Sequence, residues 1–306
     1  MKVSVIIPNY NKAAWLNKCL ESCLIQGEWL KEIIVVDDGS TDESASILST
    51  YQDSIPDMIR TYINPVKGAN NARNFGFSLS SGAYIQWLDS DDELYPGKFK
   101  AQVEALESTG KDIAYSDWLR RYYSEGKLIK EEEKLYRDFD DFLYQLMIDN
   151  WTSPNNYLVR REFAEKLKGG MGWNPETRIG QDREYFTMAG ILGAKFEYVP
   201  GVFACYNSQD KNTIANMEFM ERLKENQKLE ARFRDAIIES DLLADGPKEE
   251  YLKILNTHLV KACFYNNEIQ FPRWISPLKL KWSLVHPKMK LFLPWVIIRK
   301  NIQWLL

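Results

Sequence analysis

The chain has 306 residues, 45% of them hydrophobic, with a formal net charge of −4 and a pI of about 5.5. This content allows a large buried core, as one extended domain or as a domain with an appendage. The mildly acidic balance argues against a general affinity for nucleic acid, and no signal-peptide pattern precedes the first apolar run. The four cysteines show neither metal-type spacing nor a disulfide framework, which is typical of a cytoplasmic protein. Cys19 and Cys23 lie four apart on one face of a predicted helix, and we expect both to be reduced core residues.

The first ninety residues alternate between strand and helix patterns. Four short apolar runs predict strands, and each of the first three leads into a helical pattern; the runs are 3–8, 32–36, 58–63 and 83–88. Such alternation is typical of an α/β fold with a mostly parallel sheet covered by helices on both faces. Ligands of these folds gather beyond the carboxyl ends of the strands. Three of those ends carry polar clusters: Pro8-Asn9-Tyr10, Asp37-Asp38 and Asp89-Ser90-Asp91.

The fourth strand runs directly into three carboxylates within four positions, Asp89, Asp91 and Asp92. Carboxylates this close repel one another, so the cluster predicts a bound cation. Mg²⁺ and Mn²⁺ prefer a few carboxylates together with the phosphate oxygens of a substrate. The sequence therefore favours a metal–diphosphate site here, and an acidic turn after an edge strand is the alternative.

Four motifs in succession resemble those of family 2 glycosyltransferases with the GT-A fold. They are residues 3–11 (VSVIIPNYN), 35–42 (VVDDGSTD), 68–74 (GANNARN) and 88–92 (LDSDD). The resemblance implies an inverting, metal-dependent transfer from a nucleotide-diphosphate sugar, with a UDP-sugar as the expected donor. We expect a GT-A domain over residues 1–215, with a donor half (1–118) and an acceptor half (119–215), and a helical extension over 216–306.

The resemblance also implies roles for the residues that match its first two motifs. Pro8 and Tyr10 would border the nucleobase, with the tyrosine ring as a stacking surface, although Tyr10 could also belong to the core. Asp38 would accept the imide N–H of uracil. Asp37 would support that turn or contact the ribose.

The remaining donor-side roles concern the diphosphate and the metal. By the same resemblance, Asp91 would bind Mn²⁺ or Mg²⁺ directly, with Asp92 as a less certain neighbour. Asp89 would contact the ribose, the metal or a metal-bound water. Arg73 would contact the diphosphate or the donor sugar, because its planar fork suits oxyanions, or would form a surface ion pair instead.

The middle of the chain keeps the α/β pattern. It predicts a helix at 96–109, a strand at 112–118, a charged hairpin or solvated face over 120–141 and a strand at 157–160. Trp151 stands ahead of the last of these. It could provide a platform for an acceptor sugar or pack in the core.

A second candidate site is Gly180-Gln181-Asp182, at the start of a predicted helix. A carboxylate in the first turn suits the positive end of the helix dipole, so capping is one interpretation of Asp182. The family commonly places its general base in a Gly-Glu-Asp motif here, and the resemblance implies that role for Asp182. Gln181 replaces the usual Glu, which leaves the base in place and puts any acceptor contact of that Glu in doubt.

Two strands are predicted after this helix, at 195–200 and 201–206, and residues 207–213 resemble the loop that often closes over the donor. Many relatives have an Arg or His in that loop. This chain has only Lys211 there, and its two histidines are His258 and His286. A third protein ligand to the metal is therefore in doubt.

The last third is predicted to be helical over 219–243 and 251–265, and it ends in a segment of different composition. Residues 271–306 contain seven Lys or Arg, no Asp or Glu, and interleaved tryptophans and aliphatics. This mixture suits an interfacial helix on anionic lipid at the inner face of the cell membrane, and its apolar stretches are too short to span a bilayer. A glycan or lipid-linked acceptor would fit such a place. The alternative is a helix packed on the main domain or in a dimer contact.

Two other classes of protein stay open. A sugar nucleotidyltransferase would carry a Gly-rich phosphate loop after the first strand, where Pro8-Asn9-Tyr10-Asn11 stands. A non-catalytic nucleotide-sugar-binding relative is disfavoured by the joint presence of Asp89, Asp91 and Asp182.

Overall fold

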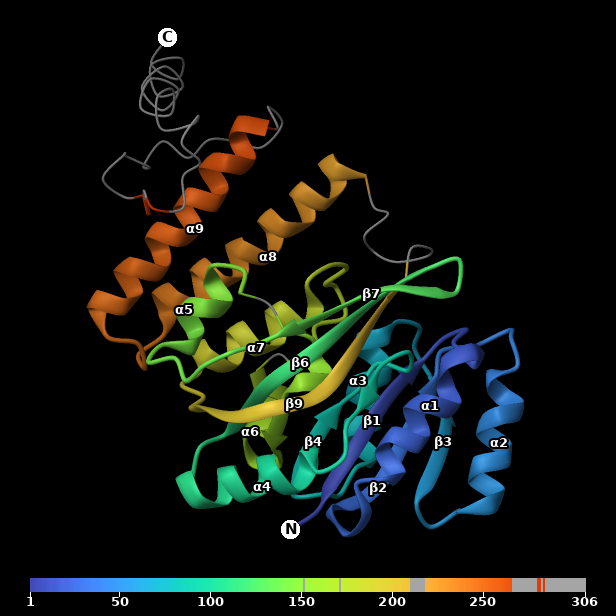
Figure 1. Ribbon diagram of the computed structural model, residues 1–306. Coiled ribbons are helices and arrows are strands. Elements are labelled where there is room, and N and C mark those ends of the chain that lie inside the picture. Colours follow the sequence, from blue (N-terminus) through green and yellow to red (C-terminus); the bar gives the residue numbers. More distant parts are fainter. Residues whose placement is uncertain (151, 171, 210–217, 266–279, 282, 284–306) are drawn as a thin grey trace. The chain divides into compact units, whose positions relative to one another are not determined.

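The computed structural model describes residues 1–150, 152–170, 172–209, 218–265, 280–281 and 283 (Figure 1). The chain divides into two compact units that interleave in sequence. The first unit contains Met1–Asp140, Trp151–Glu176 and Ala194–Asn216. The second contains Asp141–Asn150, Thr177–Gly193 and Met217–Leu306. The domain boundary predicted after residue 215 stays a prediction.

One sheet, built from nine strands of the described chain, lies entirely in the first unit. Its order is β3-β2-β1-β4-β8-β6-β9-β5, and β7 pairs with β6. Strands β1 to β4 pair in parallel with their neighbours, as do β6 and β9, whereas β8 runs antiparallel between β4 and β6. The mostly parallel sheet predicted from the sequence is thus confirmed. The strands are β1 (Val3–Asn9), β2 (Leu30–Asp37), β3 (Ile59–Ile63), β4 (Tyr84–Trp87), β5 (Glu93–Leu94), β6 (Ile113–Ser124), β7 (Lys127–Lys134), β8 (Leu158–Arg160) and β9 (Phe196–Gln209).

Helices cover both faces of this sheet, as the alternating pattern predicts. Apolar side chains of α1, α2 and α4 share one core with β1 and β2, and α3 packs on the opposite face against Ile34 and Val36. At Gly76 of α3, a Cβ atom would come within 2.7 Å of Ile6, so a glycine is needed for this close packing. Cys19 and Cys23 are buried free thiols, as expected. The helices of this unit are α1 (Ala13–Leu24), α2 (Ser44–Ser54), α3 (Ala69–Leu79), α4 (Lys98–Thr109) and α6 (Arg161–Gly170).

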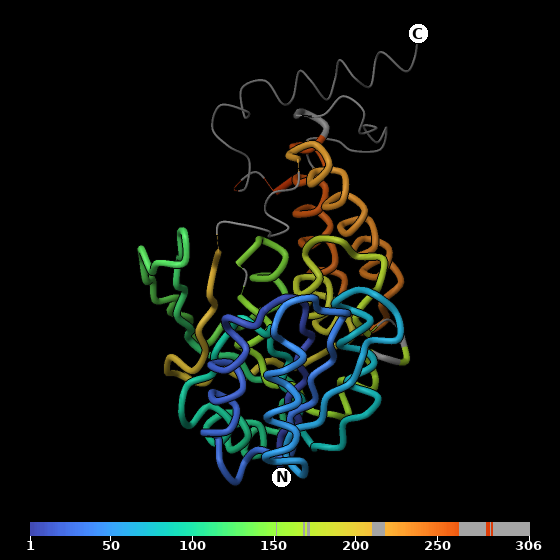
Figure 2. Tube along the Cα trace, turned by 90° about the vertical axis from the view of Figure 1, so that its right-hand side faces the viewer, coloured from blue at the N-terminus to red at the C-terminus, as the bar shows by residue number. Residues whose placement is uncertain are grey.

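The charged stretch after residue 120 forms the predicted hairpin, from the end of β6 and β7. In Figure 2 this green hairpin lies beside the gold strand β9, with which β6 pairs. The two strands predicted at 195–200 and 201–206 are one strand, β9, and this expectation is corrected. Its register shifts where Asp117 pairs with Val202, because Gly201 has a φ of 127° and donates its N–H to Asp117 at 3.1 Å. The bulge bends the strand without ending it.

The second unit is helical among its described residues. Its helices are α5 (Phe142–Met147), α7 (Gln181–Ile191), α8 (Phe219–Glu239) and α9 (Asp245–Tyr265). The predicted helices at 219–243 and 251–265 correspond to α8 and α9, and α9 begins earlier than expected. Helix α5 was not predicted, because six residues are too few to show a helical period. Asp141 caps it by accepting the N–H of Tyr144 at 2.8 Å.

Buried charges of the second unit are neutralised within that unit. Glu230 on α8 lies 3.3 Å from Arg183 on α7 and 2.8 Å from His258 on α9. Burial raises the pKa of Glu230, but the hydrogen bond and charge of His258 and the charge of Arg183 outweigh it, so the pKa falls below its ordinary value. Glu184 likewise contacts Arg232 at 2.5 Å and accepts a hydrogen bond from Thr177. These groups join the helices to one another.

Most of the basic tail, residues 271–306, lies outside the described residues. Of its described positions, Lys281 donates its backbone N–H to Thr257 at 2.8 Å and pairs with Glu250. None of the helices in the described ranges is long and apolar enough to cross a membrane. Trp151 and Lys211 also lie outside the described residues.

Candidate functional site

The three polar clusters predicted at strand ends meet at one edge of the sheet. Strand β1 pairs with both β2 and β4 in parallel, and Asn9 at the end of β1 pairs with Asp37 at the end of β2. Pro8 is buried within β1, whereas the Tyr10 side chain just beyond it is 52% exposed. The core alternative for Tyr10 is therefore wrong, and its ring is accessible at the edge where ligands bind in parallel sheets.

Asp37 is buried and builds the turn that follows β2. Its carboxylate accepts hydrogen bonds from Asn9 Nδ2 at 2.8 Å, from the Gly39 N–H at 3.2 Å and from the Ser40 N–H at 2.9 Å. The Ser40 hydroxyl adds a fourth bond at 2.5 Å. These bonds agree with the first of the two roles predicted for Asp37, the support of this turn.

Asp38 joins the turn after β2 to the loop before α3. Its carboxylate accepts the side-chain amide of Asn64 at 2.6 Å and the Gly68 N–H at 3.0 Å. Its own backbone N–H donates to the Asn9 carbonyl at 2.8 Å. The end of β1 and the loop before α3 thus together hold Asp38 in place.

Arg73 and Asp89 form an ion pair next to the end of β4. Arg73 Nη2 lies 2.6 Å from Asp89 Oδ1, and Nη1 donates to Asn70 at 2.9 Å. The guanidinium stacks over Trp173, 4.4 Å from the ring centroid, and Arg73 is only 5% exposed. The alternative of a surface ion pair is therefore wrong: the pair is real, but the arginine is buried and orients Asp89.

Asp91 already has a cationic neighbour that the sequence did not indicate. Lys12 Nζ lies 2.6 Å from Asp91 Oδ2, and Gln209 Nε2 donates to the same oxygen at 3.2 Å. Burial raises the pKa of Asp91, and the charge and hydrogen bond of Lys12 oppose this effect. A single lysine before a helix gives no pattern that would mark it as part of a site.

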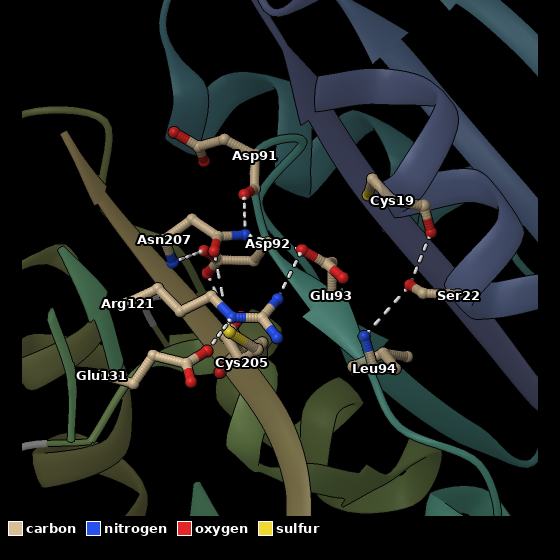
Figure 3. Close-up of polar contacts among 11 residues, drawn as sticks. Cys19, Ser22, Asp91, Asp92, Glu93, Leu94, Arg121, Glu131, Cys205 and Asn207 are labelled. Atoms are coloured by element: carbon tan, nitrogen blue, oxygen red, sulfur yellow. Dashed lines mark hydrogen bonds and ion pairs between the residues drawn. The ribbon is translucent and has the colours of Figure 1, made fainter. Parts of the chain in front are cut away.

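Asp92 points away from Asp91 and into the protein, as Figure 3 shows. It is fully buried and accepts the Asn207 N–H at 2.9 Å and Asn155 Nδ2 at 3.0 Å. Burial, followed by the charges of Asp91 and Asp89, raises the pKa of Asp92 well above its usual range. Asn207 also donates its side-chain amide to the Asp91 carbonyl at 2.8 Å. Asp92 therefore holds the acidic turn against β9 and does not face the same space as Asp91.

Asp89 and Asp91 are the residues that could hold a divalent ion. Their side chains are 31% and 20% exposed, and each ion pair described above uses one carboxylate oxygen. No group of three or more His, Cys, Asp or Glu suited to a metal occurs within the described part of the chain. Mg²⁺-type sites often use one or two carboxylates plus substrate phosphates. The residues thus fit an ion that is bound together with a diphosphate.

Asp182 lies in the first turn of α7, in the second unit. It is half-buried, and Gly180 before it is left-handed with a φ of 64°. Gln181, the residue in place of the family's Glu, donates its side-chain amide to the Thr177 carbonyl at 3.1 Å. The role of Asp182 as a base stays a prediction.

Two curated relatives match part of the chain in sequence. An uncharacterized glycosyltransferase of Nostoc sp. (strain PCC 7120) is 38% identical over 173 residues, which make up 55% of this chain and 53% of that protein. The uncharacterized glycosyltransferase YibD of Escherichia coli (strain K12) is 36% identical over 122 residues, 39% of this chain and 35% of that protein. The match thus spans about half, or less, of the length of these relatives.

Solved structures resemble the whole chain. S. aureus TarS 1-349 in complex with UDP-GlcNAc has a TM-score of 0.66 at 17% identity, covering 99% of this chain and 89% of that one. The complex of TarS 1-349 with UDP has a TM-score of 0.64 at 16% identity, covering 99% and 88%. At such identities the likeness shows the fold alone, and it confirms the expected GT-A type of sheet with a helical C-terminal region.

The sequence model of glycosyl transferase family 2 matches residues 4–168, which is more than half of the chain and includes all the strand ends described above except that of β9. This match shows that the chain belongs to glycosyl transferase family 2.

Proposed function

We propose that this enzyme transfers a sugar from a UDP-sugar to a hydroxyl of a glycan or lipid-linked acceptor, with inversion at the anomeric carbon. The observation that carries the proposal is the edge of the sheet where the exposed Tyr10 ring and the acidic pair Asp89 and Asp91 follow neighbouring parallel strands. A stacking surface beside a metal–diphosphate site suits a nucleotide sugar. The complexes of TarS with UDP and UDP-GlcNAc support this class of donor.

In this proposal, each donor-side residue contacts or supports a different part of the nucleotide. Tyr10 stacks on the base and Pro8 shapes the strand end beneath it. Asp38 accepts the imide N–H of uracil, and Asp37 keeps the turn in place through its four hydrogen bonds. Arg73 acts through Asp89, which it orients at 2.6 Å. A carboxylate can only accept hydrogen bonds, so Asp38 suits a base that has a donor, as uracil has in its imide N–H.

Asp91 and Asp89 would hold Mn²⁺ or Mg²⁺ beside the diphosphate. A divalent ion there supplies charge neutralisation for the leaving group. Asp91 keeps 20% of its side chain exposed, whereas Asp92 is fully buried, so Asp91 is the direct ligand in this proposal.

Asp182 is the general base of the proposed reaction. As the acceptor oxygen approaches the anomeric carbon, Asp182 takes the hydroxyl proton, and the bond to the diphosphate breaks on the opposite face of the sugar. The helix dipole of α7 favours the ionised carboxylate that this step needs.

The basic tail supports a place at a membrane surface. Seven Lys or Arg with no Asp or Glu over 271–306 would be attracted to anionic lipid at the inner face of the cell membrane. Co-sedimentation of the full chain with anionic vesicles tests this at low and high salt. Binding that falls as salt rises supports it, and a chain that stays in the supernatant at low salt contradicts it.

The donor class is tested by release of nucleotide from UDP-, GDP- and dTDP-sugars with Mn²⁺ and with EDTA. We expect metal-dependent release from a UDP-sugar, with UDP-GlcNAc as the first one to try. Release from GDP-sugars alone would contradict the role of Asp38. Absence of both binding and release with every donor would contradict the proposed function.

A further inference from the structure

The two candidate metal ligands are already neutralised, one cation each. Lys12 lies 2.6 Å from Asp91, and Arg73 lies 2.6 Å from Asp89. The third carboxylate of the cluster, Asp92, is fully buried and held by Asn155 and Asn207. Without a ligand, Asp89 and Asp91 therefore each already have a positive counter-charge that a metal ion would have to compete with.

Hydrogen bonds of the residues before and after Lys12 hold its backbone in place. Asn11 before it has a left-handed φ of 52°, and its backbone N–H donates to the Ser40 hydroxyl at 2.9 Å. The Asn11 side chain accepts the Thr41 N–H at 2.7 Å. The N–H of Ala13, after Lys12, donates to Asp42 at 2.9 Å. A strained, hydrogen-bonded segment thus aims Lys12 across to Asp91, which lies 79 positions away in sequence.

The target of Lys12 is also fixed. The Asp91 carbonyl accepts the Asn207 amide at 2.8 Å, and its carboxylate accepts Gln209 at 3.2 Å. Both partners belong to the end of β9. Two segments held this firmly make the contact between Lys12 and Asp91 a built feature of the edge, unlike an ion pair between two mobile surface side chains.

An ammonium group and a divalent ion cannot share Asp91 easily. Both are cations that seek the same carboxylate oxygens, and like charges a few ångströms apart repel. The described residues supply two carboxylates and no third acidic ligand. The attraction of these two carboxylates for a metal ion is therefore weak compared with the repulsion from the Lys12 ammonium. A diphosphate changes the balance, because it brings oxygens both for a metal and for an ammonium group.

We propose that Lys12 is the resident counter-ion of Asp91: it competes with the divalent ion for this carboxylate and moves to the diphosphate when donor and metal bind together. The proposal rests on the proposed function for its donor half. Lys12 thereby makes metal binding depend on the donor, and it is a positioning residue that keeps the site from taking up a metal ion alone.

The test measures Mn²⁺ binding to the full chain by the electron paramagnetic resonance signal of free Mn²⁺, with and without UDP. Lys12→Met keeps the length of the side chain and removes its charge. Lys18→Met is the matched control, because Lys18 is exposed on α1 and removing it changes the net charge equally. Lys12→Gln is a second variant if the methionine variant does not fold, as judged by its melting curve.

Without UDP, we expect Lys12→Met to bind Mn²⁺ about fivefold more tightly than the wild type, the size of one partly exposed ion pair. Lys18→Met should match the wild type. UDP should strengthen Mn²⁺ binding in the wild type more than in Lys12→Met, because Lys12 no longer links the two ligands.

Equal or weaker Mn²⁺ binding by Lys12→Met without UDP would overturn the competition. An equal gain from UDP in both proteins would overturn the transfer of Lys12 to the diphosphate. If UDP does not bind the wild type at all, the proposed donor function fails. The nucleotide-free comparison still decides the competition in that case, so the two failures are distinguishable.

Discussion

The strand-end loops of the first unit and the helices of the second unit both contain paired carboxylates, but in different settings. Asp89 and Asp91 keep 31% and 20% of their side chains exposed, each with one cationic partner. Glu184 and Glu230 are 3% and 7% exposed, and each has two polar partners from other elements. A partly exposed carboxylate can exchange its partner for a ligand. A buried carboxylate with two partners joins helices instead, and removing its charge breaks those contacts inside the protein.

Asp182 is an exception to this contrast, because it lies in a helix of the second unit and is nevertheless proposed to act as the general base. We expect Asp182→Asn to lower transfer by about 10²–10⁴-fold while donor affinity is kept, since an amide cannot accept the proton of the acceptor. Turnover and UDP binding are measured on the same preparation.

Asp245→Asn is the matched control for Asp182→Asn. Asp245 is also a carboxylate in the first turn of a helix of the same unit, so it shares the dipole effect, and it has no role in the proposed reaction. Turnover should be unchanged in this variant. Loss of donor binding together with a lowered melting temperature in Asp182→Asn would favour a helix-capping role for Asp182.

Glu230→Gln tests whether a buried carboxylate of the second unit stabilises the fold. The change removes the buried carboxylate that pairs with both Arg183 and His258, and we expect the free energy of unfolding to fall by about 3 kcal/mol. Glu239→Gln, at an exposed position of the same helix, should change it by less than about 0.5 kcal/mol. Urea unfolding of both variants provides the comparison, and equal stabilities would remove the structural role of Glu230.

The stabilisation by Glu230 should also depend on pH. Its pKa is lower in the folded protein than the usual 4.5, so its contribution is full above that value and is lost as the pH falls through the lowered pKa. The difference in stability between wild type and Glu230→Gln should therefore shrink in acid. A difference that stays constant from neutral pH to below pH 4 or so would contradict this assignment.

The sequence predicted the parallel part of the sheet well, for a physical reason. Strands β1 to β4 are short apolar runs that end in polar motifs, and these local patterns place Tyr10, Asp38 and Asp91 at one edge. Elements with no room for a pattern were missed, such as the two-residue strand β5 and the six-residue helix α5. The bulge in β9 was misread as a strand boundary because Pro200 and Gly201 are typical of turns.

Partners of the acidic cluster could not be predicted from sequence. Lys12 and Asp91 are 79 positions apart, Asn155 and Asp92 are 63 apart, and Asn207 and Asp92 are 115 apart. Only the folded sheet brings these pairs together. The spacing of the three carboxylates shows that they are close along the chain, but it could not show that Asp92 is buried and that Arg73 is bound to Asp89.

The central claim is that Asp91 binds a divalent ion together with the nucleotide. Calorimetric titration of UDP with and without Mn²⁺ tests it most directly. The proteins are the wild type, Asp91→Asn, and Asp57→Asn as a control, an exposed carboxylate just before β3, at the amino end of that strand. We predict that Mn²⁺ strengthens UDP binding to the wild type and to Asp57→Asn but not to Asp91→Asn, with melting temperatures unchanged. Mn²⁺-dependent UDP binding that is equal in all three proteins would contradict the account.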